Sequence, residues 1–421
     1  YSAHLPRLRK EDFEVYTNDK IACDWPFKYK DLIPYYKINE KNLNLAGLIG
    51  DKNYSDFDYL NPPVKIGKMG KKLTKAFDKL KWNWWYSYSG ITTQKKNRSI
   101  GSVSTVLNSY YEVRKKKNFE IKTCCTVYNL HLSQDNRVKG VSYIDGNNES
   151  KYVEAKVVLL AANAIGTTRL LLNSKINSFS KGVANSSGLV GKNLMLHPLG
   201  FVDGVFAETT GSNLGPPGCC VYSHQFYKNN KRFKRGFTIQ ALRSQNSYEV
   251  AKYLMKLKKL NFGKKFHKDF ISYYGKNISL GMICEDLPLE TNRVTLSNST
   301  SIHKNIPGAN VEYKISNNTK EMLKFSLTIG KKLLTYAGSK FTLAFGPIKN
   351  AGWHLLGTAK MGNDKKNSVV NKNGQTHDIK NLYIIDGSIF PTSGSVNPAN
   401  TIQAIALKIS DYIKENFNTI R

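Results

Sequence analysis

The sequence predicts a mixed α/β fold in two parts, a nucleotide-binding α/β layer and an antiparallel sheet with covering helices. Three observations lead to this prediction. Residues 157–173 have the order of a buried strand, a turn of small residues and a helix. Residues 200–316 contain short runs in which apolar and polar residues alternate, which is typical of antiparallel strands. Apolar stripes with helical spacing follow over 318–337 and after Pro398.

The composition is that of a folded chain. The 421 residues are 40% hydrophobic and 11% aromatic, which is ample for a core and excludes wholesale disorder. No apolar run reaches the roughly eighteen residues of a membrane-spanning helix, so we expect no integral membrane segment. The six cysteines are scattered and include the adjacent pairs Cys124-Cys125 and Cys219-Cys220. These spacings predict neither a disulfide scaffold nor a metal site.

The charge is strongly basic, with 63 Lys and Arg against 31 Asp and Glu, or +32. Such a balance can indicate a nucleic-acid partner. However, 52 of the basic residues are Lys and only 11 are Arg, the usual reader of bases and phosphates. The lysines are spread along the chain beside many Asn, Ile and Tyr, as an A/T-rich genome would produce. We therefore expect no nucleic-acid partner.

Residues 1–92 are expected to be irregular and polar, with aromatic clusters at 25–27, 35–36 and 82–86. The clusters favour a core or a domain seam, and a substrate-facing wall is the alternative. From 119 onward the pattern is strand-like. Val127 and Leu130 precede one turn, and 138–143 precede the hairpin signal Asp145-Gly146. Residues 157–160 then form an apolar run that leads into the small residues 161–166 and a helix over 168–173.

Further strands are expected at 237–241, 292–296 and 311–315. The helix over 318–337 has Asn318 as its expected N-cap and Gly338 as its stop. A short apolar run at 382–385 is closed by Asp386-Gly387. Asn397 and Pro398 then give a strong helix start. The apolar face of that last helix is expected to hold Ile402, Ile405, Ile409, Ile413 and Phe417.

One segment of this C-terminal region is specific enough to suggest a family. Residues 352–362, Gly-Trp-His-Leu-Leu-Gly-Thr-Ala-Lys-Met-Gly, resemble the His-x-x-Gly-Thr-x-x-Met-Gly segment of glucose–methanol–choline (GMC) oxidoreductases. Shorter pieces follow the order of the same family at 160–169, 188–198, 368–370, 381–393 and 397–401. Residues 9–13 and 24–26 with Tyr35-Tyr36 are similar to its bacterial dehydrogenase branch.

The resemblance implies a discontinuous FAD-binding Rossmann-like domain over 93–199 and 351–421. The substrate-binding or cap domain would take 1–92 and 200–350. The family opens with a strand and a G-x-G-x-x-G turn that holds the pyrophosphate, and no such turn occurs here. We therefore expect that the chain is N-terminally truncated, that the first βαβ unit is missing, and that FAD binds poorly without it.

The resemblance also implies the chemistry, which is oxidation of an alcohol with transfer of hydride to flavin N5. His354 matches the catalytic histidine of the family, and histidine suits a base that works near neutral pH. The alternative for His354 is a core histidine beside Trp353. Asn397 matches the second catalytic position and is expected to hydrogen-bond the substrate oxygen. The alternative for Asn397 is a plain N-cap, which need not exclude a catalytic role.

Cofactor-binding residues follow from the same resemblance. Asp386 and Gly387 would lie near the phosphate–ribityl part of FAD. Asn397, Pro398 and Thr401 would present the N-terminus of the last helix to the flavin. Val127 and Ala161 would lie near the adenine. His197 and His377 are expected to be structural, and no role is predicted for Glu285 or Arg293.

The predicted function is thus FAD-dependent oxidation of an alcohol group on a sugar, polyol, sugar acid or choline-like molecule. Electrons would pass to a quinone or cytochrome partner rather than to oxygen. A non-catalytic fragment or a basic surface-binding protein is the alternative. The compartment is left open between the cytoplasm and the periplasm.

Overall fold

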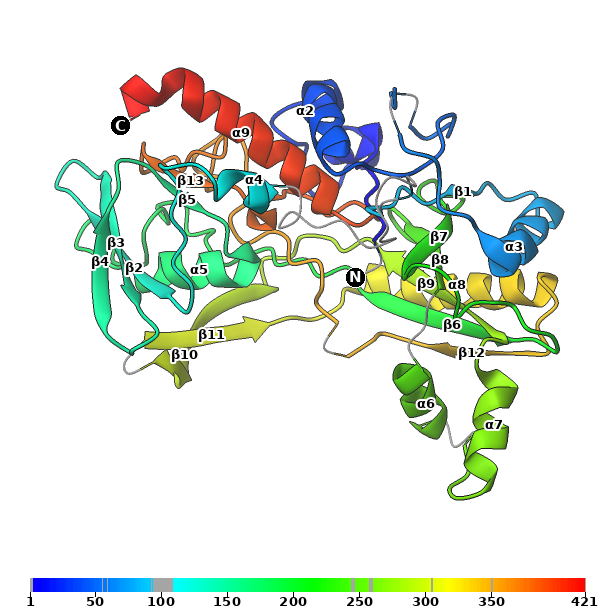
Figure 1. Cartoon of the computed structure of the whole chain (residues 1–421). Coiled ribbons are helices and arrows are strands. Elements are labelled where there is room, and N and C mark those ends of the chain that lie inside the picture. The colour runs from blue at the N-terminus through cyan, green and yellow to red at the C-terminus, as the bar shows by residue number, and fades with distance from the viewer. Residues whose placement is uncertain are drawn as a thin grey trace.

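Six antiparallel strands form the larger sheet of the protein, on the right of Figure 1. The computed structural model describes residues 3–54, 56–58, 60–91, 93, 109–243, 247–256, 260–303, 306–349 and 351–420. Across the sheet the strands are β1 (Trp85–Tyr86), β7 (Gly218–Ser223), β8 (Phe237–Arg243), β9 (Asn277–Cys284), β6 (Leu199–Val205) and β12 (Phe341–Phe345). Antiparallel strands were expected within 200–316; β6, β7, β8 and β9 agree with this, while β1 and β12 lie outside those bounds.

Helix α8 (Asn317–Tyr336) covers one face of this sheet, and α3 (Gly67–Lys79) packs against α8. The helix comes close to the strands at Gly330, where an added Cβ would lie 2.7 Å from a methyl carbon of Val202. Ser316 rather than the expected Asn318 caps α8, because the Ser316 hydroxyl accepts a hydrogen bond from the Thr319 N–H. The opposite face of the sheet is left for the site described below.

The second half of the molecule is the α/β layer. Strands β5 (Val158–Leu160) and β13 (Leu382–Ile384) pair in parallel, and helix α5 (Asn163–Asn173) follows β5 directly. The predicted strand and helix are present, but the helix begins at Asn163 rather than at Thr168, so most of the predicted small-residue turn belongs to the helix. The three-stranded meander β2 (Thr126–Leu132), β3 (Val138–Ile144) and β4 (Ser150–Glu154) lies beside them, with the predicted turn at Asp145. The long helix α9 (Ala399–Ile420) closes the chain.

Two strands that the sequence placed with the large sheet lie elsewhere. Strands β10 (Arg293–His303) and β11 (Ile306–Glu312) form a separate two-stranded sheet, which packs beside α5 and has one isolated bridge, from Arg293 to Lys192. The alternation of apolar residues identified them as strands, but alternation carries no information about which sheet a strand joins. Arg293 therefore does not lie on the large sheet.

The N-terminal region is less irregular than expected. It contains the short helices η1 (Lys10–Phe13) and α1 (Val15–Asp19), followed by α2 (Tyr29–Asn42) and α3. In α3 the buried Met69, Leu73, Ala76 and Phe77 have helical spacing, which the surrounding Lys and Gly residues obscure. Three further helices were not predicted: α4 (Tyr111–Val113), α6 (Ser247–Lys256) and α7 (Lys265–Tyr273).

Helix α2 lies along α9 at the top of Figure 1. Asn39 on α2 donates a hydrogen bond to Asn400 on α9 at 2.9 Å. Leu8, Phe13, Trp25 and Tyr36 share a hydrophobic core with α9 and β13. The domain boundaries inferred from the sequence stay a prediction, and this packing ties part of residues 1–92 to the α/β half.

Within the described ranges, no helix combines the length and the apolar character that crossing a bilayer requires. In the same ranges, no three His, Cys, Asp or Glu side chains are grouped so that they could hold a metal ion.

Candidate active site

A cavity of about 530 Å³ lies between the open face of the large sheet and the α/β half. Segments far apart in the sequence meet there. Six of the eight predicted catalytic and cofactor-binding residues line the cavity: Ala161, His354, Asp386, Gly387, Asn397 and Pro398. The sequence-based candidates are therefore brought together.

The cavity lies at the carboxyl ends of the two parallel strands. Ala161 follows β5 and Asp386 comes shortly after β13, and the two strands pair from Val158 opposite Leu382 to Leu160 opposite Ile384. In open α/β sheets, ligands bind in the crevice outside the carboxyl ends of parallel strands. The fold thus places Ala161 and Asp386 at the edge where a ligand is expected.

His354 is hydrogen-bonded to a second histidine. Its Nδ1 lies 2.9 Å from Nδ1 of His197, and the two rings are almost perpendicular, at 87°. Nε2 of His197 lies 2.7 Å from the carbonyl oxygen of Gly394. A third contact joins His354 Nε2 to the Asn397 side-chain amide nitrogen at 3.3 Å.

These contacts determine which ring nitrogens carry protons. A carbonyl oxygen can only accept, so His197 donates from Nε2 to Gly394. A neutral imidazole carries one N–H, so His197 Nδ1 is an acceptor. The Nδ1–H of His354 therefore donates a hydrogen bond to it. His354 Nε2 is then unprotonated, beside Asn397 in the cavity lining. The chain from Gly394 through His197 to His354 therefore leaves His354 Nε2 as a hydrogen-bond acceptor, next to the Asn397 amide in the cavity lining.

Both histidines are neutral near pH 7. Burial lowers the pKa of His197 to about 4. Burial, and secondarily the neighbouring His197, lowers the pKa of His354 to about 3. The tautomer argument, which assumes neutral rings, therefore holds across the neutral range.

Gln240 fixes the orientation of Asn397. The Gln240 side-chain N–H donates to Asn397 Oδ1 at 2.5 Å. The amide nitrogen of Asn397 consequently faces His354. Asn397 thus offers N–H donors, and not its oxygen, on the side of the histidine.

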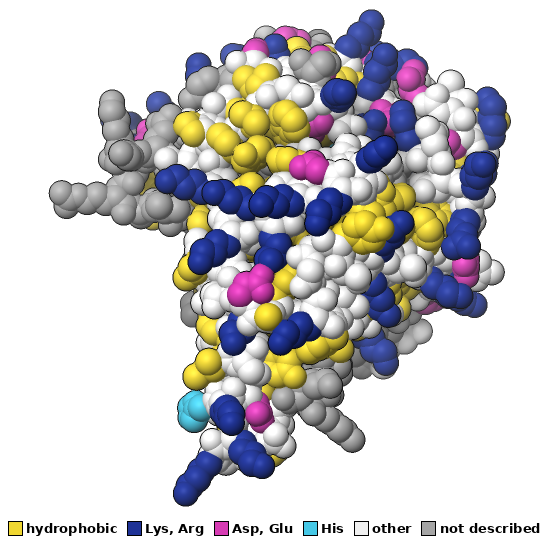
Figure 2. All heavy atoms as spheres, turned by 90° about the vertical axis from the view of Figure 1, so that its right-hand side faces the viewer, with side chains coloured by type: hydrophobic (Ala, Val, Ile, Leu, Met, Phe, Trp, Pro, Cys, Tyr) yellow, Lys and Arg dark blue, Asp and Glu magenta, His cyan; other side chains and the backbone are white. Residues whose placement is uncertain are grey.

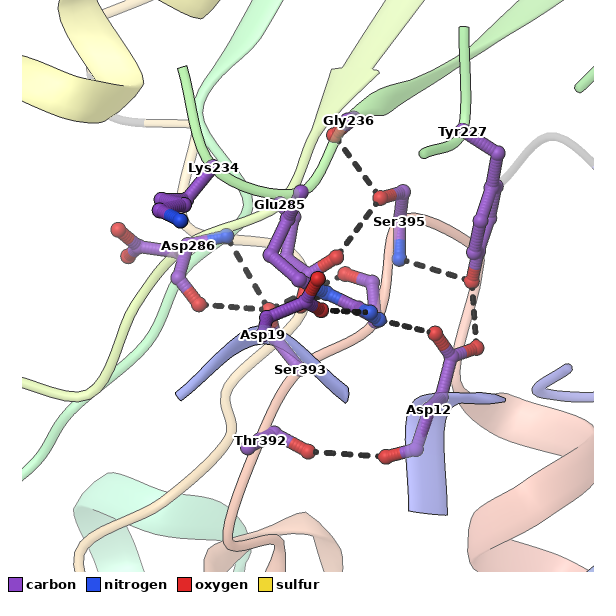
Figure 3. A network of polar contacts seen from close by, with 12 residues as sticks. Asp12, Asp19, Tyr227, Lys234, Gly236, Glu285, Asp286, Thr392, Ser393 and Ser395 are labelled. Carbon is purple, nitrogen blue, oxygen red and sulfur yellow. Dashed lines mark hydrogen bonds and ion pairs between the residues drawn. The ribbon is translucent and has the colours of Figure 1, made fainter. Parts of the chain in front are cut away.

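A buried ionic network holds the loop that carries Gly394 and Asn397. Arg235 contacts Glu285 at 2.9 Å and also contacts Asp12. Tyr227 donates to Asp12 at 2.5 Å, and Ser395 donates to Glu285 at 3.0 Å, as Figure 3 shows. Burial raises the pKa of Glu285 to about 7. Through Ser395, the network anchors the backbone next to Gly394. The carbonyl oxygen of Gly394 accepts the hydrogen bond from His197.

Asp286, next to Glu285 in the sequence, holds the backbone on the other side of Gly394. The Asp286 N–H donates to the Ser393 hydroxyl at 3.1 Å, and Ser393 donates back to the Asp286 carbonyl at 2.8 Å. Asp286 also accepts from the backbone N–H of Leu196 at 3.1 Å, next to His197. Both partners of the His197–Gly394 hydrogen bond are thereby fixed by Asp286 and its contacts.

The open face of the large sheet forms the wall opposite His354. Alternate residues of three adjacent strands point into the cavity: Leu199 and Phe201 from β6, Gln240 and Leu242 from β8, and Gly281 and Ile283 from β9. Gln240 supplies the polar side chain of this face, and none of the six residues is charged. The wall is therefore apolar apart from one uncharged amide.

Known proteins show to which family this site belongs. Two sequence profiles described as GMC oxidoreductase match residues 27–199 and 288–406. The chain is 33% identical to 2-methyl-1,2-propanediol dehydrogenase of Mycolicibacterium austroafricanum, over 100% of this chain and 80% of that protein. This chain belongs to the GMC oxidoreductase family. The resemblance seen in the sequence is confirmed, and the protein is an oxidoreductase of the dehydrogenase kind that acts on CH–OH groups.

Other GMC proteins extend the comparison. The large subunit of fructose dehydrogenase from Gluconobacter japonicus is 24% identical over 98% of this chain and 78% of its own length. Pyridoxine 4-oxidase from Mesorbium loti, a solved structure, shares the fold with a TM-score of 0.68 and 16% identity. It covers 99% of this chain and 82% of its own. The mixed α/β GMC fold thus extends over the whole of this chain.

GMC proteins bind FAD, and the residues that line the cavity of this chain fit the flavin part of that cofactor. The first turn of α9 has N–H groups without partners inside the helix, and Pro398, Ala399 and Ile402 line the cavity. Such a helix end favours negative charge. Asp386 is buried and accepts from the Thr167 hydroxyl at 2.6 Å and from the Ser388 N–H at 2.8 Å. Asp386, Gly387 and the start of α9 are the groups that would hold the flavin.

Two predicted cofactor residues of this GMC chain are not brought to the cavity. Val127 lies on β2, at the start of the meander. Thr401 is buried in α9, where its hydroxyl contacts the Tyr36 hydroxyl at 2.7 Å and accepts from the Leu8 N–H at 3.3 Å. Thr401 joins α9 to the N-terminal region, and its assignment to FAD stays a prediction, as does that of Val127.

Sequence reasoning missed two residues of this GMC site. His197 was expected to be structural, as was His377, yet only His197 lies against His354; His377 contacts Ser368 at 2.8 Å. Gln240 sits inside an ordinary alternating strand and carried no signal. His197 lies in segment 188–198, which resembles the family. That position was the one sign in the sequence that could have suggested a role for His197 in the site.

Proposed function

We propose that this GMC oxidoreductase converts a small, uncharged alcohol to the corresponding carbonyl compound. His354 Nε2 accepts the hydroxyl proton while hydride leaves the carbon that bears the hydroxyl group. The observation that best supports this proposal is the chain Gly394–His197–His354, which leaves Nε2 unprotonated. FAD, when bound, supplies the acceptor of the hydride. His354 and the residues around it supply the positioning and the proton transfer.

His197 helps His354 accept the proton. When Nε2 is protonated, the resulting imidazolium still donates its Nδ1 proton to His197, 2.9 Å away. A partner that fixes the orientation and the tautomer of a catalytic histidine is a recurring device in enzymes. The low pKa of His354, caused first by burial, keeps the base form present throughout the neutral range.

Asn397 would bind the substrate oxygen. Its amide N–H groups are turned toward His354 because Gln240 occupies its oxygen at 2.5 Å. The 3.3 Å contact with His354 is long, so a substrate hydroxyl can replace it. The N–H donor would then stabilise negative charge as the proton leaves.

The sheet wall favours a neutral substrate over a sugar acid. A carboxylate needs a cationic or multiple-donor partner in a pocket, and the six wall residues include only the amide of Gln240. A compact branched alcohol or diol fits an apolar wall with one amide. The 33% identical relative named for 2-methyl-1,2-propanediol supports this class of substrate.

The electron acceptor is proposed to be a quinone or a cytochrome partner rather than oxygen. The support is that two similar proteins are named dehydrogenases. The non-catalytic or basic surface-binding alternative is less well supported, because His354, Asn397, His197 and Gln240 form a hydrogen-bonded constellation in a cavity.

An anaerobic absorption spectrum of the complete protein tests the proposal. We expect the flavin bands to bleach with 2-methyl-1,2-propanediol or a similar small diol, and not with gluconate. His354→Ala should slow bleaching by about 10² to 10⁴, the usual contribution of a positioned base. His377→Gln is the matched control and should bleach at the wild-type rate. Bleaching by His354→Ala at the wild-type rate would remove the base from the proposal, and preference for gluconate would overturn the substrate class.

A further inference from the structure

Helices α6 and α7 stand away from the body of the protein, at the bottom of Figure 1. They belong to the connection between β8 and β9, the two strands that carry Gln240 and Gly281 in the cavity wall. The ring of Tyr273 packs edge-on against Phe341 of β12, with centroids 6.2 Å apart. The projection is thus attached to the sheet near its base, and Figure 1 shows it extending away from the body of the protein.

Large apolar side chains of this projection point into solvent. Phe262, between the two helices, is 84% exposed, and Ile271 on α7 is 65% exposed. Tyr248 and Met255, which are 67% and 43% exposed, lie two turns apart on one side of α6. Exposed apolar groups concentrated on one projection mark an interaction surface rather than chance exposure.

Lysines are interleaved with these apolar residues. Lys252 lies between Tyr248 and Met255 on α6, its Nζ 5.9 Å from the Tyr248 ring centroid. Lys264 and Lys265 follow Phe262, and Lys268 precedes Ile271 by one turn; all three are exposed. Residues 247–276 hold eight Lys against Glu249 and Asp269. At the lower edge of Figure 2, apolar and basic side chains lie side by side.

We propose that this projection docks on the surface of an anionic lipid bilayer, with Phe262, Ile271 and Tyr248 entering the headgroup–acyl boundary and the lysines at the lipid phosphates. Aromatic and aliphatic groups mixed with lysine are the pattern of helices that lie in a membrane interface. The lysine stems can lie along the apolar layer while their ammonium groups reach the headgroups. Anionic headgroups attract each such lysine.

The same surface is a poor match for a protein partner. The cores of protein interfaces are depleted in lysine, because the ammonium group would have to lose its water there. On this projection lysines sit among the apolar residues and not only around them. A bilayer surface accepts both groups together, and that is why we choose it.

Vesicle co-sedimentation of the complete, flavin-loaded protein tests the proposal, and it needs no turnover. The probes are vesicles of phosphatidylcholine alone and of phosphatidylcholine with one-third phosphatidylglycerol. We expect binding to the anionic vesicles only, weakened by salt. K264E with K265E should weaken binding by at least about fivefold for each lysine removed. Phe262→Ser with Ile271→Ser should also weaken it, and here the remaining binding should be more sensitive to salt.

The matched controls lie on another face. Lys116 and Lys117 are an exposed adjacent pair before β2, and Ile121 is 55% exposed. K116E with K117E, and Ile121→Ser, should bind as the wild type does. Equal losses in control and projection variants would overturn the proposal, as would failure to bind anionic vesicles. Light scattering that shows a dimer lost only in the projection variants, without vesicle binding, would assign the surface to a second copy of the chain instead.

Discussion

His354 and His197 form a directed hydrogen bond from Nδ1 to Nδ1 at 2.9 Å, although they are 157 residues apart in the sequence. The direction follows from the Gly394 carbonyl, which can only accept from His197. The acceptor nitrogen of His197 thus sets the tautomer of His354. This relationship makes His197 a positioning residue for the proposed base.

Replacing His197 should separate positioning from packing. His197→Leu removes the acceptor, so His354 can place its proton on either nitrogen, and we expect flavin reduction to slow by about 10- to 100-fold. His197→Gln keeps an oxygen that can accept from His354 and should retain most of the rate. The acid limb of the pH–rate profile should move to higher pH in both variants, because His197 helps to lower the pKa of His354. Equal rates for the Leu and Gln variants would contradict the tautomer argument.

Asn397→Asp should distinguish a catalytic amide from a helix cap. Aspartate caps a helix as well as asparagine does and can still accept from Gln240, but it has no N–H to offer the substrate. We expect flavin reduction to slow by about 10² to 10³, with flavin content and melting temperature unchanged. Stopped-flow spectroscopy measures the rate of flavin reduction, and the absorbance of the purified protein measures its flavin content. Loss of flavin with normal reduction of what remains bound would favour the cap alone.

Acid should destabilise the fold through His197. Its ordinary pKa of 6.5 falls to about 4 in the folded protein because it is buried, so below pH 6.5 the unfolded chain binds the proton more readily. Stability from this group is present above pH 6.5 and is lost as the pH falls toward 4, at about 1.4 kcal/mol per pH unit. Urea unfolding of wild type and His197→Gln at several pH values measures it. The raised pKa of Glu285 acts with the opposite sign from pH 4.5 to about 7, so the difference between the two proteins is the relevant quantity.

Arg235→Met should be strongly destabilising, because it leaves Asp12 and Glu285 buried without their cation. Breaking a buried pair by removing one partner typically costs about 3–5 kcal/mol in free energy of unfolding. Arg293→Met is the matched control, since its pair with Glu312 at 2.8 Å is exposed and should contribute about 1 kcal/mol or less. Denaturant melts of both variants decide the matter, and equal losses would mean that the buried network is not what holds the 392–397 loop.

The sequence predicted most of what is local. The strand and helix of 157–173 and the start of the last helix depend on residue order alone, and both formed, although α5 begins at Asn163 and α9 at Ala399 rather than at the predicted Thr168 and Pro398. The family segments pointed to His354 and Asn397, and the structure brings these two residues into contact in one cavity. His197 and Gln240 could not be found that way, since their contacts arise only when β6 and β8 pack against the loops at 354 and 397. The same reason explains β10 and β11, where alternation predicted strands but not their partners.

Gly281 should control the size of the substrate. It faces the cavity from β9, and an added Cβ would lie 3.4 Å from the nearest Leu242 carbon and 3.6 Å from Phe201, which is ordinary contact. Gly281→Ala should therefore fold normally and fill part of the cavity. We expect kcat/KM for a branched diol to fall by about 10- to 200-fold relative to an unbranched alcohol of the same chain length, the range for one methylene in an apolar pocket. Gly146→Ala, with the same 3.4 Å clearance from Cys124 but no place in the cavity lining, is the control. If both variants keep the wild-type ratio of kcat/KM values, the substrate does not lie against this face of the sheet.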